Sequence, residues 1–251
     1  MTSDHFRERI RRREPLIGTF VKTPAFHIIE LLGIAGLDFV VADAEHAPID
    51  NGQVDNMVAV AGVLPVLVRV PGNDPMPIAS VLDLGATGVV VPHVRSADDA
   101  VAVLDAADFA RGSRGFSPSV RAGRFGTDNV EAFRSRADKE RVLFVQIEDG
   151  EALEQLDAIA SIDDIDVLFI GPADLALSLG CSGADDPRLQ DAITTIAKAG
   201  QRHGRAVGIF VGSVEAIAAY RALGISVFIC GSDQSFLLAE ARRVKRSAFA
   251  G

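Results

Sequence analysis

The sequence predicts an α/β protein in which residues 1–251 form a single (β/α)8 TIM barrel. Eight short apolar runs follow one another, and segments with helical periodicity separate nearly all of them. The runs lack clean apolar–polar alternation, as expected for parallel strands that are buried on both faces. A doubly wound sheet is the alternative, but it requires a glycine-rich first turn, and the chain has neither a GxGxxG motif nor a Walker loop. The eight predicted strands are residues 16–21, 38–43, 65–70, 88–94, 142–148, 167–172, 206–211 and 226–230.

In the first half of the chain, each strand leads into a helical segment. The first strand follows a charged lead and ends at Lys22, Thr23 and Pro24. The clearest helix start is Ser96, which precedes early acidic residues and a helical apolar period. The helices expected in this half cover residues 27–36, 51–63, 75–86 and 96–110.

The second half centres on residues 141–175, in which the apolar runs VLFVQIE and VLFIGPAD flank a segment with helical spacing. A strand–helix–strand unit of this kind places its two strands parallel and adjacent. Two more strands follow, each trailed by a helix. The last helix, residues 234–249, ends in a basic turn that suits its dipole.

Composition and charge exclude several classes of protein. The net charge of −9 argues against a nucleic-acid-binding surface. No apolar run is long enough to cross a bilayer, and the charged first 15 residues contain no apolar signal region. Cys181 and Cys230 are not part of a CxxC motif, so reduced thiols are expected. We therefore expect a cytoplasmic protein without membrane or nucleic-acid partners.

Residues 111–126 interrupt the alternation of strands and helices. This segment is rich in glycine, serine and arginine and has no periodicity. A loop of this length in a compact domain is either functional or disordered. Its arginines could meet an anionic substrate or a neighbouring subunit, and a solvated surface loop is an equal alternative; they are Arg111, Arg114, Arg121 and Arg124.

Glu148 and Asp174 are the candidate metal ligands. Each closes a predicted strand, so both should lie at the carboxyl end of the barrel, where sites in this fold are found. Two converging carboxylates repel each other, and a hard divalent cation relieves that repulsion. Either residue alone would suit a helix cap, but the pair, with Gln146 nearby, favours a metal. Mg²⁺, Mn²⁺ and Co²⁺ all suit such a site.

Arg69 stands out because it lies among valines at a strand end, where a guanidinium needs an anionic partner. A substrate carboxylate is the natural partner, and a salt bridge to Glu148 or Asp43 is the alternative. His46 follows Asp43 by three residues, so an orienting carboxylate is present and the imidazole could act as acid or base. His93 also lies at a strand end, but without an acid nearby in the sequence.

Two further features of the barrel mouth suit a ligand. The backbone of Gly171, Pro172 and Ala173 could bind an anionic oxygen, and Phe210 would form an apolar wall. Together the mouth residues favour deprotonation, or carbon–carbon bond cleavage, next to a carbonyl, with a metal as Lewis acid. A metal-free aldolase would instead use a lysine Schiff base, and among the lysines only Lys22 is expected at the mouth.

Five motifs carry a resemblance to a known family: DAEHAP at 43–48, VRV at 68–70, LDLGA around Asp83, VQIE at 145–148 and GPADL at 171–175. Together they resemble the HpcH/HpaI aldolase family over about residues 18–231. The resemblance implies a metal-dependent class II aldolase on a (β/α)8 barrel. Such an enzyme would cleave 4-hydroxy-2-oxo acids reversibly to an aldehyde and pyruvate, or a related 2-oxo acid such as hydroxypyruvate.

The resemblance also implies roles for individual residues. Glu148 and Asp174 match the metal ligands, and Arg69 matches the arginine that holds the pyruvyl group. His46 with Asp43 matches a dyad that manages the proton, and Asp83 matches a further acid of that network. Gln146 and the backbone from Gly171 to Asp174 would line the donor site. Members of the family assemble as hexamers that exchange a C-terminal helix between barrels, so a homo-hexamer is expected.

The chain departs from the family pattern in the 111–126 loop and at Phe210, where a smaller aliphatic residue is common. Both are expected near the aldehyde, so the departures concern the acceptor. The alternative function is a CoA-thioester lyase of the citrate lyase β-subunit type, for which the arginine loop is the only supporting feature. A non-enzymatic binding protein is disfavoured by the intact set of candidate site residues.

Overall fold

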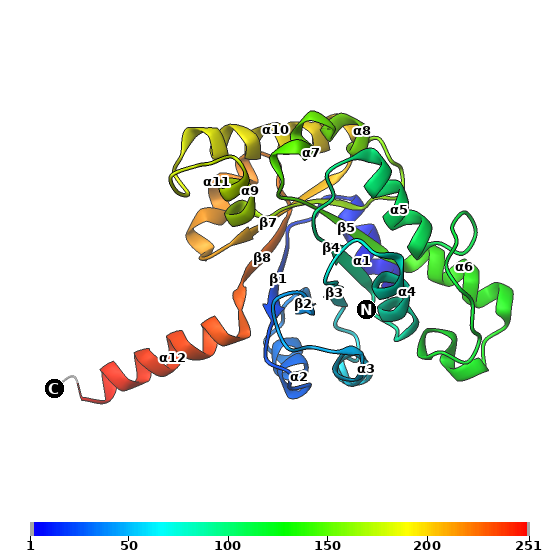
Figure 1. Cartoon of the computed structure of the whole chain (residues 1–251). Coiled ribbons are helices and arrows are strands. Elements are labelled where there is room, and N and C mark those ends of the chain that lie inside the picture. The colour runs from blue at the N-terminus through cyan, green and yellow to red at the C-terminus, as the bar shows by residue number, and fades with distance from the viewer. Residues whose placement is uncertain (1–2, 250–251) are drawn as a thin grey trace.

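The computed structural model describes residues 3–249 and shows a closed barrel of eight parallel strands surrounded by helices (Figure 1). Each strand pairs with the next along the chain, and the eighth pairs with the first. Each predicted run overlaps one strand, so the barrel prediction is confirmed and the doubly wound alternative is wrong. The strands are β1 (Leu16–Val21), β2 (Phe39–Asp43), β3 (Val66–Arg69), β4 (Gly88–Val91), β5 (Val142–Ile147), β6 (Val167–Ile170), β7 (Ala206–Val211) and β8 (Val227–Ser232).

The helices between the strands largely follow the predicted segments. Ser96 is the predicted helix start, and it caps the helix through reciprocal hydrogen bonds with Asp99. The helical segment before β6 is broken into two short helices at Gln155, where ψ is 4°. The helices are α2 (His27–Ile34), α3 (Asn51–Val60), α4 (Pro75–Asp83), α5 (Ala97–Ala107), η1 (Arg121–Gly126), α6 (Val130–Glu140), α7 (Gly150–Glu154), α8 (Leu156–Ala160), α9 (Pro172–Ser178), α10 (Pro187–His203), η2 (Val214–Ala216), α11 (Ile217–Ala222) and α12 (Asp233–Ala248).

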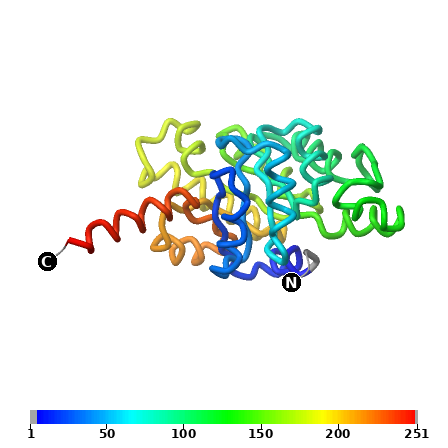
Figure 2. Tube along the Cα trace, turned by 90° about the horizontal axis from the view of Figure 1, so that it is seen from below, coloured from blue at the N-terminus to red at the C-terminus, as the bar shows by residue number. Residues whose placement is uncertain are grey.

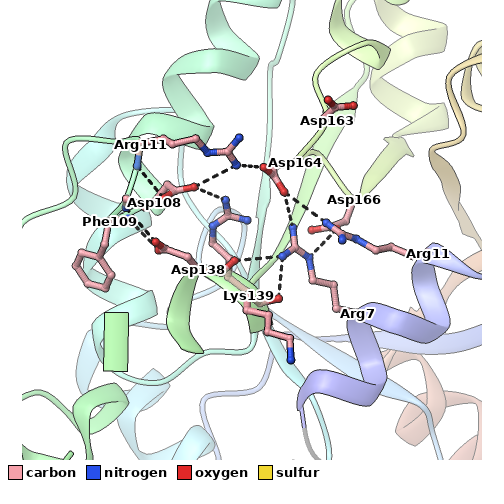
Figure 3. A network of polar contacts seen from close by, with 12 residues as sticks. Arg7, Arg11, Asp108, Phe109, Arg111, Asp138, Lys139, Asp163, Asp164 and Asp166 are labelled. Atoms are coloured by element: carbon pink, nitrogen blue, oxygen red, sulfur yellow. Dashed lines mark hydrogen bonds and ion pairs between the residues drawn. The ribbon is translucent and has the colours of Figure 1, made fainter. Parts of the chain in front are cut away.

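The charged N-terminal lead is also a helix, α1 (Ser3–Arg11), which the sequence pattern did not reveal. Its Phe6 and Ile10 are buried with residues from the beginnings of the strands, so α1 closes the N-terminal end of the barrel. Arg7 attaches the helix by donating to Asp166 at 2.8 Å and to the carbonyl of Lys139 at 2.8 Å (Figure 3). Charged residues dominate this helix, and its described side chains include two deeply buried apolar residues, Phe6 and Ile10.

The core has two parts, as a barrel requires. Side chains that point inward include Phe39, Phe144 and Phe169, whose rings contact one another along the barrel interior. A larger cluster of valine, leucine, isoleucine and alanine fills the space between the strands and the outer helices. Burial on both faces explains why the strands read as continuous apolar runs.

The arginine-rich segment 111–126 does not lie at the barrel mouth. It follows α5, at the opposite end of that helix from β4, and its arginines pair with carboxylates of this chain. Arg114 donates to Asp83 at 2.6 Å, and Arg121 binds both oxygens of Asp55 on α3. The expectation that this segment sits beside the aldehyde is therefore wrong for the barrel to which it belongs.

The final helix, α12, leaves the barrel and projects away from it in both views (Figures 1 and 2). Apolar side chains on it are exposed, among them Leu237 at 73% and Val244 at 53%. Exposed apolar side chains on a helix that projects from its own barrel suggest that another chain covers them.

Cys181 and Cys230 are both free, as predicted. Within residues 3–249, no helix combines the length and the apolar character needed to cross a membrane.

Candidate active site at the mouth of the barrel

A cavity of about 340 Å³ opens at the carboxyl ends of the strands. All of the predicted donor-site and wall residues line it, together with several that the sequence did not single out. The lining residues are Phe20, Lys22, His46, Arg69, Gln146, Phe169, Gly171, Pro172, Ala173, Asp174, Phe210, Gly212, Gly231, Ser232 and Ser235.

Arg69 ends β3 and is held by carboxylates of this chain. Its Nε donates to Asp43 Oδ1 at 2.9 Å and its Nη2 to Asp43 Oδ2 at 2.7 Å, while Glu45 Oε2 lies 3.3 Å from Nε. The guanidinium also lies 4.4 Å from the centroid of the Phe20 ring. The salt bridge to Asp43, which the sequence left as an alternative, is thus present, and Arg69 still faces the cavity.

Asp43 is fully buried and keeps its charge because cations and N–H groups surround it. Burial raises its pKa, but the hydrogen bonds and charge of Arg69, the N–H of His46 and the charge of Lys22 outweigh this, so the pKa lies below its usual range. Lys22 Nζ is 3.2 Å from Asp43 Oδ2. Asp43 therefore stabilises two cations at the mouth.

The predicted pairing of the His46 ring with Asp43 is not what the structure shows. Asp43 Oδ1 accepts a hydrogen bond from the backbone N–H of His46 at 3.1 Å, so it positions the residue through its main chain. The ring lines the cavity, and its nearest carboxylate is Glu45, with Nε2 and Oε2 separated by 3.6 Å. The Asp43 oxygens are occupied by Arg69, which explains why they do not reach the imidazole.

Glu148 follows β5 directly and is buried at the base of the site. Its Oε2 accepts a hydrogen bond from Gln146 Nε2, and its Oε1 accepts one from the backbone N–H of His93 at 3.0 Å. Burial raises the pKa of Glu148; the N–H and the charge of His93 oppose this, the charge of Asp174 adds to it, and the pKa lies above its usual value. A buried carboxylate in this state is one that a cation would stabilise.

His93 contributes more to the site than the sequence indicated. Its φ of +55° is a left-handed conformation, which costs a residue with a side chain about 1–2 kcal/mol and often marks a functional site. Its Nδ1 lies 3.1 Å from Asp149 and 3.3 Å from Glu148. Burial lowers the pKa of His93, but these carboxylates and Glu45 outweigh it and raise the pKa.

Two donor sets near Glu148 could hold a metal ion. Among residues 3–249, His93, Glu148 and Asp149 have ligand atoms within 4.8 Å of one another. The second set is the predicted one, in which Asp174, near the start of α9, acts on Glu148 through its charge and lines the cavity. The buried Oε1 of Gln146 has no hydrogen-bond partner among the described atoms and adds a further oxygen there. These oxygen donors fit a hard divalent cation.

A glycine is required at position 171 because the backbone there passes close to the Glu148 side chain. A Cβ at this position would lie 2.8 Å from Glu148 Oε2 and 2.9 Å from Gln146 Nε2. Any larger residue would displace the two side chains that form the base of the site. The predicted anion site at Gly171, Pro172 and Ala173 does line the cavity.

Of the two predicted residues Phe210 and Asp83, the first lines the cavity and the second does not. Phe210 lines the cavity as a wall, with its ring centroid 5.9 Å from that of Phe20. Asp83 ends α4 and its carboxylate binds Arg114, outside the set of residues that line this cavity. Within one chain the structure does not bring Asp83 to His46.

Asp149 and Phe20 were not predicted as site residues, and His93 was given little weight. Asp149 directly follows Glu148, and Phe20 precedes Lys22 by two residues, so a closer search of strand ends would have found both. The left-handed conformation that brings His93 to Glu148 has no signal in the residue type itself.

Sequence matches to known proteins extend over nearly the whole chain. The family model described as HpcH/HpaI aldolase/citrate lyase matches residues 16–239. A 5-keto-4-deoxy-D-glucarate aldolase from Enterobacter sp. (strain 638) is 36% identical over 233 residues, which are 91% of this chain and 90% of the relative. A 2-dehydro-3,6-dideoxy-6-sulfogluconate aldolase from Pseudomonas putida is 32% identical over 240 residues, 94% and 93% of the two chains.

A solved structure agrees with the sequence matches. An HpcH/HpaI aldolase/citrate lyase family protein from Burkholderia cenocepacia J2315 superposes with a TM-score of 0.93 at 30% identity. The match covers 98% of this chain and 99% of the other.

Proposed function

We propose that this chain, which belongs to the HpcH/HpaI aldolase/citrate lyase family, is a class II aldolase with a divalent metal cofactor. Its reaction would be the reversible cleavage of a 4-hydroxy-2-oxo acid to an aldehyde and pyruvate, or a related 2-oxo acid such as hydroxypyruvate. The observation that carries the proposal is that Arg69, Gln146 and Asp174 line one cavity, with the buried carboxylate of Glu148 at its base.

Glu148 and Asp174 would hold the metal, with Mg²⁺ or Mn²⁺, and Co²⁺ as a further option, as the ions that suit oxygen donors. A bound divalent ion would supply a Lewis acid that polarises the ketone of the 2-oxo acid and stabilises the enolate. Gln146 positions Glu148 through its hydrogen bond. Gly171 keeps the space that both side chains need.

Arg69 would bind the pyruvyl group of the donor. The described hydrogen bonds of its guanidinium use Nε and Nη2, which leaves Nη1 for a ligand. Asp43 and Phe20 hold the guanidinium plane, so Arg69 is oriented before the donor arrives. The charge that develops on the enolate oxygen would be stabilised by this fixed cation.

His46 would accept the proton of the C4 hydroxyl group during cleavage and return it during addition. Its ring lines the cavity, and the carboxylate of Glu45 at 3.6 Å would stabilise the imidazolium that forms. Asp43 contributes by fixing the backbone of His46. Asp83 remains a candidate for this network only if a neighbouring subunit supplies it.

The arginine loop was the only feature that favoured a CoA-thioester lyase of the citrate lyase type, and its position does not support that reaction. The arginines expected to meet a nucleotide lie away from the mouth, and two of them bind Asp55 and Asp83. We further propose that the protein acts in the cytoplasm on small molecules, as a homo-hexamer.

Proton exchange at C3 of pyruvate tests the proposal without knowledge of the aldehyde. The protein is freed of metal with EDTA, and exchange in D2O is followed by NMR before and after addition of Mg²⁺ or Mn²⁺. We expect exchange only with metal, and loss of both exchange and aldol cleavage in Arg69→Ala. Exchange that persists at the wild-type rate in Arg69→Ala would contradict the role of this residue.

A further inference from the structure

The cavity has two sides with different chemistry. The side formed by β3, β5 and β6 carries Arg69, Gln146 and the segment from Gly171 to Asp174, and the proposed function uses it for the donor. By that assignment, the opposite side of the cavity, from β1, β7 and β8, is left for the aldehyde. It is lined by Phe20, Lys22, Phe210, Gly212, Gly231, Ser232 and Ser235.

Lys22 is the one cationic side chain among the described residues that line this second side. It directly follows β1, and its backbone is attached to the start of α12. Asp233 Oδ1 accepts from the N–H of Lys22 at 2.8 Å, and Oδ2 accepts from the N–H of Thr23 at 3.2 Å. The backbone that carries the Lys22 side chain is therefore fixed by the hydrogen bonds that these two N–H groups donate to Asp233.

The ammonium of Lys22 keeps donors for a ligand. Nζ is 3.2 Å from Asp43 Oδ2, but the same carboxylate already accepts two shorter hydrogen bonds from Arg69. An ammonium has three donors, so the contact with Asp43 uses one and leaves two. The side chain of Lys22 is 30% exposed, whereas that of Asp43 is fully buried, so a molecule in the cavity can reach Lys22 and not Asp43.

The groups around Lys22 suggest the shape of such a molecule. The rings of Phe20 and Phe210 form an apolar wall on the same side of the cavity. Ser232 adds a hydroxyl group beside it, whereas the hydroxyl of Ser235 donates to the carbonyl of Ser232 at 2.8 Å. The carboxylate of Asp233 is occupied by backbone N–H groups, so it competes little for the ammonium. A short apolar chain that ends in an anionic group matches this arrangement.

We propose that Lys22 binds an anionic group at the distal end of the aldehyde, so that the preferred acceptors are aldehydes that carry a carboxylate, sulfonate or phosphate. The inference rests on the proposed aldolase function and adds the class of acceptor to it. Lys22 is then a specificity-determining residue that contacts the substrate away from the reacting carbonyl carbon. Its removal should raise KM for anionic aldehydes more than it lowers kcat.

The test compares matched aldehydes in aldol addition with pyruvate and Mn²⁺. Succinic semialdehyde is paired with butanal, and glyceraldehyde 3-phosphate with glyceraldehyde, so that carboxylate and phosphate are distinguished. We expect wild type to prefer the anionic member of at least one pair. In Lys22→Met the ratio of kcat/KM for that pair should fall about 10- to 100-fold, as expected for loss of a hydrogen bond between charged groups.

Two further variants separate charge from structure. Lys22→Arg keeps the cation and should retain most of the preference. Lys198→Met makes the same change on the exposed face of α10 and should behave as wild type. An anionic-to-neutral ratio in Lys22→Met equal to that of wild type, or no preference in wild type, would overturn the inference.

Exchange of pyruvate C3 protons separates this inference from the function on which it rests. If wild type exchanges protons but shows no Lys22-dependent preference, the aldolase proposal stands and the acceptor inference fails. If wild type does not exchange protons with Mg²⁺ or Mn²⁺, the proposed function fails, and the acceptor inference fails with it.

Discussion

Arg69 and Asp43 face each other across neighbouring strands and form a buried pair with hydrogen bonds of 2.9 and 2.7 Å. The register of β2 and β3 places the two residues directly opposite one another. The strand ladder, and not a loop, therefore sets their geometry. A two-point contact fixes the plane of a guanidinium, and so decides which of its N–H groups face the cavity.

Asp43→Asn is predicted to reduce both stability and activity. The change removes the carboxylate that binds the buried cation of Arg69 at two points and leaves it the single contact with Glu45, which costs about 3 kcal/mol in the free energy of unfolding. A guanidinium that is no longer fixed should lower kcat/KM about 100-fold. Urea unfolding and steady-state kinetics measure the two effects.

Asp55→Asn is the matched control for that variant. Asp55 also binds an arginine, Arg121, through both oxygens, but its side chain is 38% exposed. An exposed pair contributes about 1 kcal/mol or less. Equal destabilisation of the two variants would mean that burial of the Asp43–Arg69 pair has no special importance.

Binding of Mn²⁺ is predicted to stabilise the fold through Glu148 and Asp174. At a concentration of a hundred times Kd, a ligand of the folded state adds about 2.7 kcal/mol, which appears as a rise in Tm. Glu148→Gln and Asp174→Asn should remove most of that rise. Calorimetry with and without Mn²⁺ measures it.

Asp149→Asn distinguishes the two donor sets. If the metal is held by Glu148 and Asp174, this variant should keep the Mn²⁺-dependent rise in Tm. If instead the ion is held by the cluster of His93, Glu148 and Asp149, the rise disappears in Asp149→Asn and survives in Asp174→Asn.

The barrel and the residues at its mouth could be predicted because they depend on periodicity and strand direction. Apolar runs separated by helical segments specify parallel strands, and parallel strands bring their carboxyl ends to one edge. That argument places Arg69, Phe210 and Asp174 at one mouth, and all three line the cavity there.

The partners of each side chain could not be predicted in the same way, because they depend on distances of a few ångströms. Asp43 binds Arg69 and not the ring of His46. A left-handed backbone brings His93 to Glu148. The arginine loop was expected near the aldehyde from the family resemblance, but its position follows from the end of α5. Composition does not show on which end of a barrel a loop lies.

Acid should weaken the ionic network near α1 through Asp108 (Figure 3). Burial raises the pKa of Asp108, but the N–H groups of Arg111 and Ala110 and the charge of Arg141 lower it to about 2, from 3.8. Because the folded pKa is depressed, the contribution to stability is present above about pH 4 and is lost as the pH falls through 2. The difference corresponds to about 2 kcal/mol.

Asp108→Asn is therefore predicted to be less stable than wild type at pH 7, with a difference that shrinks below pH 4. Urea unfolding between pH 7 and pH 2 measures the difference. Asp185→Asn, at an exposed acid, should follow wild type throughout. A difference between Asp108→Asn and wild type that stays constant down to pH 2 would show that the Asp108 charge is not its origin.

The exposed apolar residues of α12 predict an oligomer in which this helix packs on another chain. Wild type should have the mass of a hexamer by light scattering, and the double change Leu237→Asp with Leu238→Asp should yield smaller species. Arg246→Asp adds a negative charge to the opposite face of α12 and should leave the mass unchanged. A monomeric wild type would contradict the prediction.

Borohydride treatment in the presence of pyruvate should leave no adduct on Lys22. Lysines that form Schiff bases are typically desolvated or placed beside another cation, whereas Lys22 is partly exposed and lies 3.2 Å from a carboxylate. We expect peptide mass spectrometry to show unmodified Lys22, with Lys22→Met as the matched blank, while EDTA abolishes turnover. A pyruvyl adduct on the peptide that contains Lys22, with turnover retained in EDTA, would replace the metal-dependent reaction with the Schiff-base route.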